Sequence, residues 1–160
     1  MTIADSIQTV LLVLVVLQLW VSFRSYRADH ERRKKQATFE FVNSVSDRYR
    51  SSLSKFDAKH GAGKLVDLSN YDDEDKFFVK SYLNEIERIC AGVNAGVFDY
   101  AILRKMMSSN LRDSHHRFSQ YIKEAQGRNG MLYCEFDEVV KKLASDVEKS
   151  YKNVGKISKS

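Results

Sequence analysis

The chain has 160 residues, a net charge of +5 and no proline. Its length suits a single domain, and the absence of proline suits long uninterrupted helices. The positive charge does not indicate a nucleic-acid binder, because residues 24–35 hold six basic and two acidic residues, whereas residues 36–160 hold twenty basic and eighteen acidic ones. Cys90 and Cys134 lie in helical patterns beside apolar neighbours, which favours packing roles over a disulfide or a metal site.

The first segment of the chain is strongly apolar. Between Ile7 and Phe23, twelve of seventeen residues are Ile, Leu, Val or Phe, and none is charged. Seventeen helical residues span roughly 25 Å, and a start at Ile3 extends the span to roughly 31 Å, close to a hydrocarbon core of about 30 Å. The sequence therefore predicts a transmembrane anchor over residues 1–23. The alternative is a buried central helix of a soluble protein.

Basic residues follow the apolar segment instead of preceding it. A secretory signal has the opposite order, with positive charge first and a small-residue cleavage site last. Because an excess of Lys and Arg marks the cytoplasmic side of a membrane, we expect the N-terminus outside and the rest of the chain in the cytoplasm. Residues 24–35 should form a basic stalk that attracts anionic headgroups of the lipid bilayer at about 1 kcal/mol per basic residue. The predicted membrane-interface residues are Trp20, Arg24, Arg27, Arg32, Arg33, Lys34 and Lys35.

Residues 36–152 show the periodicity of amphipathic helices joined by turns. The first of these helices continues from the stalk and ends before Gly61 and Gly63. The second opens with "YDDEDK", whose negative charge complements the macrodipole of a first turn, and it ends at Gly96. The two predicted apolar faces are Phe39, Val42, Tyr49, Leu53 and Phe56, and then Phe78, Tyr82, Ile86, Ile89 and Val93.

Two further helices follow. Asp99 is the predicted N-cap of a helix that runs to about Gln126, and "GRNG" provides the next turn. Residues 153–160 are expected to fray. The apolar faces are Leu103, Met107, Leu111, Phe118, Tyr121 and Ala125, and then Leu132, Phe136, Val140, Leu143, Val147 and Tyr151. The predicted fold class is all-α, with one N-terminal transmembrane helix that continues into a juxtamembrane helix and a small antiparallel helical bundle.

Few residue patterns indicate chemistry. "HGAGKL" lacks the first glycine of a phosphate-binding loop, because Ala58 stands there, and Leu65 replaces the Ser or Thr after the lysine. The four histidines have no metal-ligand spacing, and we expect them to be exposed polar residues: His30, His60, His115 and His116. Glu85 and Glu87 point in different directions on their helix, which disfavours a shared acid/base site. We therefore expect no metal and no cofactor.

One stretch suggests an enzyme as the alternative. "RDSHHRF", residues 112–118, resembles the Arg-polar-x-x-x-His signature of the HEPN helical-bundle ribonucleases. The spacing is short by one residue, so that Arg117 occupies the position of the motif histidine. The resemblance implies a membrane-tethered ribonuclease in which Arg112 and His116 act on RNA. By helical angle, both residues fall on the polar face of their helix.

A wider resemblance covers roughly Ala37 to Leu143. "YLNEIERICAGVNAGVFDYAIL", "RFSQYIKEAQGR" and "YCEF" are similar to a bacterial family of unknown function with one N-terminal span and a helical cytoplasmic domain. The resemblance implies a bacterial or prophage setting and an accessory role, with no catalytic residues to carry over. We interpret its recognisable positions as scaffold, with Glu87 and Arg128 as partners across two helices. These positions are Leu83, Asn84, Glu87, Gly92, Gly96, Asp99, Phe118, Ile122 and Arg128.

From the anchor and the bundle we expect a noncatalytic interaction module on the cytoplasmic side of the bacterial inner membrane, acting in phage exclusion or defence. Its expected partners are the bilayer, an unknown protein and further copies of the chain, because Gln18 can hydrogen-bond between transmembrane helices. No nucleic-acid partner is expected.

Overall fold

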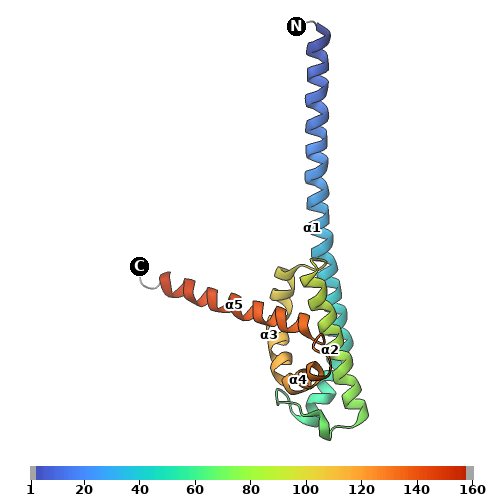
Figure 1. The fold of residues 1–160 in the computed structure, drawn as a ribbon, viewed down its shortest axis with the longest axis vertical. Helices are drawn as coiled ribbons and strands as arrows, with labels where there is room; N and C mark the ends of the chain where they lie inside the picture. Colours follow the sequence, from blue (N-terminus) through green and yellow to red (C-terminus); the bar gives the residue numbers. More distant parts are fainter. Residues whose placement is uncertain (1–2, 158–160) are drawn as a thin grey trace. The chain divides into compact units, whose positions relative to one another are not determined.

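The computed structural model describes the backbone of residues 3–157 and the side chains of residues 8, 11–69 and 71–149. Every regular element in this part of the chain is helical, which confirms the all-α fold class (Figure 1). The chain divides into two compact units, Met1–Gln36 and Ala37–Ser160. The elements are α1 (Ile3–His60), the 3-10 helix η1 (Leu68–Asn70), α2 (Asp73–Asn94), α3 (Tyr100–Arg117), α4 (Ser119–Arg128) and α5 (Cys134–Ile157).

Helix α1 is continuous and contributes residues 37–60 to the second unit. In that unit Val42, Val45 and Phe56 are buried, but Phe39 is 52% exposed, so its predicted place on the core face was wrong. The turn between α2 and α3 explains the difference, because it packs on the side of α1 that carries Thr38. The hydroxyl of Thr38 accepts a hydrogen bond from the backbone N–H of Asp99 at 2.7 Å, and its side chain is fully buried.

Helices α1 and α2 pack antiparallel through aromatic side chains. The ring of Phe56 lies 5.3 Å from that of Phe78, and the ring of Tyr49 lies 5.5 Å from that of Tyr82. Asp72 caps α2 by accepting from the backbone N–H of Asp75, and the predicted acidic first turn follows with Asp73, Glu74 and Asp75. The predicted apolar face of α2 is confirmed, since its four residues from Tyr82 to Val93 are buried and Phe78 packs against the core.

A tight turn connects α2 to α3. Gly96 has a φ of +75°, a conformation that glycine adopts without the strain of a Cβ atom. The predicted cap of α3 is confirmed, because the Asp99 carboxylate accepts from the backbone N–H of Ile102 at 2.9 Å. Gly92 allows the ring of Phe98 to lie against α2, since a Cβ at that position would be only 2.3 Å from the ring.

The predicted third helix is broken at Phe118 into α3 and α4. The backbone N–H of Val66 donates to the carbonyl of Arg117 at 2.9 Å, so this oxygen is occupied by the loop after α1 instead of by the next helical turn. Phe118 takes φ −99° and ψ 15° and is fully buried. The predicted inner face survives the break, with Leu103, Met107 and Leu111 buried in α3 and Ile122 and Ala125 buried in α4.

Helix α5 begins at Cys134, two residues later than the predicted stripe, and Leu132 is 39% exposed. Glu87 of α2 determines this start by accepting the backbone N–H groups of Glu135 and Phe136 at 3.2 and 2.8 Å. Phe136, Val139 and Leu143 are buried. The helix extends to Ile157, beyond the predicted bundle end at residue 152, and residues 158–160 of the predicted tail lie outside the described residues, as does the side chain of Tyr151.

Candidate functional site

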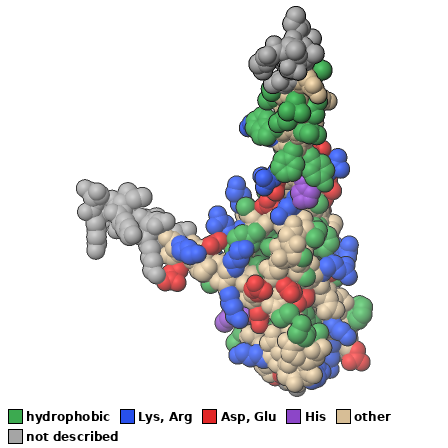
Figure 2. Space-filling model, turned by 45° about the horizontal axis from the view of Figure 1, so that its top comes forward, with side chains coloured by type: hydrophobic (Ala, Val, Ile, Leu, Met, Phe, Trp, Pro, Cys, Tyr) green, Lys and Arg blue, Asp and Glu red, His purple; other side chains and the backbone are tan. Residues whose placement is uncertain are grey.

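Apolar side chains cover the surface of α1 between Leu11 and Phe23. From Leu11 to Phe23, the large apolar side chains are each between 51% and 67% exposed, and Figure 2 shows green side chains at the surface of this segment. By length and composition, α1 is the one helix among the described residues that is able to cross a membrane, and none of its apolar window is buried. A buried central helix of a soluble protein would have that window covered, so this alternative is not supported.

Two arginines at the end of the apolar segment lie over aromatic rings one turn earlier. The guanidinium carbon of Arg24 is 5.5 Å from the ring centre of Trp20, and that of Arg27 is 5.9 Å from the ring centre of Phe23. Such pairs combine an amphipathic ring and a cation, the two side-chain types enriched where a helix leaves the hydrocarbon. Of the other predicted interface residues, Arg33 pairs with Asp29 at 3.3 Å, Arg32 and Lys35 are exposed, and Lys34 is half-buried.

The predicted ribonuclease pair lies on one face of α3, and both residues are exposed. Arg112 donates from Nε to the carbonyl of Ser108 on its own helix at 3.3 Å. His116 lines an open cavity of about 290 Å³ together with Asn110, Asp113 and Arg117, and Arg112 is not among the lining residues. The geometry therefore does not bring the two predicted residues together around one cavity.

Arg117, which occupies the position of the motif histidine, is buried and has a structural role. Its side chain is 9% exposed, and Nη1 lies 2.5 Å from Oδ1 of Asp57 in an ion pair that lacks hydrogen-bond alignment. Nη2 donates to the carbonyl of Gly61 at 3.4 Å, and the guanidinium lies 5.1 Å from the ring centre of Phe56. Arg117 thus ties the end of α3 to the end of α1. Its burial was missed, because an arginine in a polar sequence stretch has no distinguishing pattern.

His60 is at the centre of a polar cluster at the end of α1. Its Nε2 lies 2.7 Å from Oδ2 of Asp75, and its ring stacks on Tyr71 at 4.1 Å. Lys59 contacts the same Asp75 oxygen at 2.6 Å and also pairs with Asp72. The hydrogen bonds to Asp72 and Asp75 raise the pKa of Lys59, and the bond from Lys59 lowers the pKa of Asp72. The prediction that His60 is an exposed polar residue was wrong, since its side chain is only 15% exposed.

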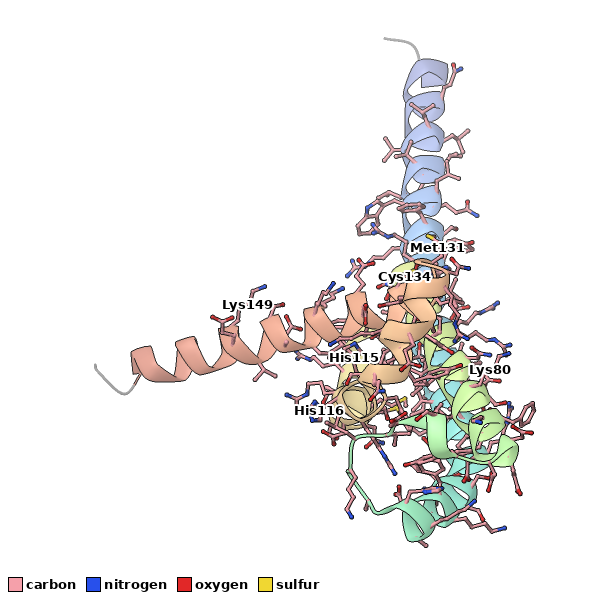
Figure 3. All side chains as sticks on the ribbon, turned by 60° about the horizontal axis from the view of Figure 1, so that its bottom comes forward. Lys80, His115, His116, Met131, Cys134 and Lys149 are labelled. Carbon is pink, nitrogen blue, oxygen red and sulfur yellow. The ribbon has the colours of Figure 1, made fainter. Side chains whose placement is uncertain are left out.

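A second histidine–carboxylate pair joins three helices. His115 Nε2 of α3 lies 2.6 Å from Oδ1 of Asp137 in α5, and Gln126 of α4 donates to Oδ2 at 2.9 Å (Figure 3 labels His115 and its neighbour His116). Burial acts to raise the pKa of Asp137, but the hydrogen bonds from Gln126 and His115 outweigh it and hold that pKa below its usual value. His115 is half-buried, so the prediction of an exposed residue fails here too.

The residues that carried the family resemblance have packing and capping roles. Asn84 accepts a hydrogen bond from the hydroxyl of Tyr133 at 3.3 Å. Glu87 caps α5, which corrects its predicted pairing with Arg128, and partial burial raises the pKa of its carboxyl. Leu83, Phe118 and Ile122 are in the core. Among the described residues, no group of three or more His, Cys, Asp or Glu is arranged to hold a metal ion.

Over residues 3–157 the fold and these contacts define an all-helical protein, in which one helix is long and apolar enough to span a membrane. The chain belongs to the DUF4760 family, a domain of unknown function, whose match covers residues 8–143. The match begins at residue 8, inside the apolar segment. The resemblance noted in the sequence begins only at Ala37. No curated protein and no solved structure matches the chain.

Proposed function

We propose that the protein is a noncatalytic interaction module, anchored in the bacterial inner membrane by residues 1–23, with its N-terminus outside and its second unit in the cytoplasm. The observation that carries the proposal is the uncovered apolar surface from Leu11 to Phe23, followed by arginines that lie over Trp20 and Phe23. The six basic residues of the stalk support this orientation and a partnership with anionic headgroups. The family resemblance implies a bacterial or prophage setting, and the role we propose there is phage exclusion or defence.

The second unit supports the role of a binding module. Its core is continuous, and an open groove of about 640 Å³ lies between α1 and α2, with aromatic side chains on its walls. Tyr49, Phe56 and Phe78 contribute to this groove, and Phe77 at its edge is 71% exposed. An exposed aromatic side chain beside a groove with aromatic side chains on its walls is typical of surfaces that bind proteins. The partner we propose is a protein, either a cytoplasmic one or a further copy of the chain.

Membrane extraction and topology mapping test the anchor and its orientation. Alkaline carbonate should leave the full chain in the membrane pellet, and a C-terminal tag should resist protease added outside intact spheroplasts. Changing Arg24, Arg27, Arg32 and Arg33 together to Glu should invert a measurable fraction of the molecules, because the positive charge next to the span sets its orientation. Changing the exposed Lys80, Lys105 and Lys123 to Glu is the matched control and should leave the orientation unchanged. Release of the wild-type chain by carbonate would refute the proposal.

The ribonuclease alternative makes a different prediction. If Arg112 and His116 act on RNA, the purified full chain degrades RNA and loses this activity on His116→Ala. The noncatalytic proposal predicts RNA that stays intact with both proteins. Degradation by the wild type alone would replace the proposal with an enzymatic function.

A further inference from the structure

Helix α5 separates apolar and basic residues along its whole length. At about 100° per residue, apolar residues at seven positions share one face of a helix, and the lysines of the same segment fall on the opposite face. The apolar set is Phe136, Val140, Leu143, Val147, Tyr151, Val154 and Ile157. The basic set is Lys141, Lys142, Lys149, Lys152 and Lys156.

Among the described side chains of α5, burial of this apolar stripe decreases toward the C-terminal end. Phe136 and Leu143 are 0% and 1% exposed, whereas Val147, on the same face one turn later, is 36% exposed. Figures 1 and 3 both show the last turns of α5 extending away from α2, α3 and α4, and Lys149 lies on this part of the helix. The sequence continues the stripe through residues 151, 154 and 157. A short helix with such a stripe is marginally stable in water without a partner.

The charges of α5 indicate what kind of partner covers the stripe. Asp146 accepts a hydrogen bond from Tyr100 at 2.9 Å and pairs with Arg104 at 3.3 Å, so its charge is already compensated by α3. Beyond it, Lys149, Lys152 and Lys156 stand against the single carboxylate of Glu148. A helix with an apolar face and a lysine face is the type that lies in the interface of an anionic membrane.

We propose that residues 143–157 of α5 are a second membrane contact, which buries its apolar stripe among the acyl chains at the surface of an anionic bilayer. A second copy of the helix would cover the apolar stripe but leave the lysines without an opposite charge, and a nucleic acid would pair with the lysines but leave the apolar stripe uncovered. The inference rests on the proposed anchor, because an anchored chain holds α5 near the same bilayer at a high effective concentration. The module then contacts lipid through both ends of its described chain.

Hydrogen exchange of the full chain in lipid nanodiscs tests this proposal. One protein per disc is compared in phosphatidylglycerol and in phosphatidylcholine, with α2 amides as the reference for the folded core. The amides of residues 147–157 should exchange at least about tenfold more slowly in the anionic lipid. Lys149→Glu, Lys152→Glu and Lys156→Glu together should abolish this difference. The control is the triple change of Lys80, Lys105 and Lys123 to Glu, which alters the net charge equally and should keep the difference.

Three results would overturn the inference. Equal exchange rates in the two lipids would show that the lysines do not contribute to the membrane contact. Protection that increases when two chains share a disc would assign the stripe to a second copy. Rapid exchange in both lipids would leave the stripe without a partner. Because each comparison uses the wild-type chain, it does not depend on the folding of a variant, and carbonate extraction separately reports whether the anchor itself has failed.

Discussion

At the residue scale, Arg117 is a polar side chain whose removal should destabilise the fold. It is a buried cation paired with Asp57, and the exposed Arg112 on the same helix provides a natural comparison. A buried ion pair contributes little net stability against an apolar replacement of both partners, but removal of one partner leaves the other charge uncompensated. The same substitution should therefore cost much more stability at Arg117 than at Arg112.

Arg117→Met is expected to lower the free energy of unfolding by about 3 kcal/mol, the lower end for a broken buried pair, because Asp57 remains 28% exposed. Chemical denaturation of the detergent-solubilised chain, followed by near-ultraviolet circular dichroism, measures this change. Arg112→Met should stay within about 0.5 kcal/mol of the wild type. The double variant Asp57→Asn, Arg117→Met should recover much of the loss, and no recovery would contradict the ion-pair assignment.

The carboxylate of Asp137 predicts a pH dependence. Its folded-state pKa lies below the ordinary value of 3.8, because hydrogen bonds from Gln126 and His115 outweigh the effect of burial. A lowered pKa means that the carboxylate stabilises the fold above that ordinary value, and that this contribution is lost as the pH falls through the lowered pKa. Unfolding midpoints measured from pH 6 to pH 2 should therefore converge for the wild type and Asp137→Asn as the solution becomes acidic. A constant separation across this range would contradict the prediction.

At the element scale, the turn between α2 and α3 depends on the absence of a side chain at Gly92. Gly92→Ala would place a Cβ 2.3 Å from the ring of Phe98, so this ring must move. Overpacking of this kind costs about 1–3 kcal/mol. Gly127→Ala in α4 is the matched control, because nothing lies within 4 Å of its Cβ position, and it should stabilise the chain by about 0.5–1 kcal/mol. Thermal unfolding in the same detergent should show a lower melting temperature for Gly92→Ala and a higher one for Gly127→Ala. Equal shifts of the melting temperature would refute the packing argument.

The elements also show which features local patterns can predict. Periodicity and capping signals identified the apolar span, the acidic opening of α2 and the cap at Asp99, because these features depend on residues within one or two turns. The break at Phe118 and the late start of α5 depend on Val66 and Glu87, which are distant in sequence. The same is true of His60 and His115, whose burial is determined by carboxylates on other helices, and of Phe39, whose exposure is determined by the turn that packs beside it.

At the scale of the whole molecule, the uncharged polar residue inside the span predicts self-association. Gln18 is exposed on an otherwise apolar segment, and in a bilayer its amide gains a hydrogen-bond partner when two copies meet. Gln18→Leu should weaken association by about 1–2 kcal/mol, measured by energy transfer between labelled chains in vesicles. Gln8→Leu, close to the start of the span, is the control and should have a smaller effect. Transfer that is unchanged by Gln18→Leu would argue against this contact.

The joint between α3 and α4 has a consequence for the order of folding. The backbone N–H of Val66, which interrupts the helix, belongs to the loop after α1. An isolated peptide of residues 98–130 therefore lacks it. In that peptide the carbonyl of Arg117 is free to accept from Tyr121, and carbon chemical shifts should report a helix without interruption through Phe118. The break is then acquired only when the loop docks, so this segment on its own favours one longer helix.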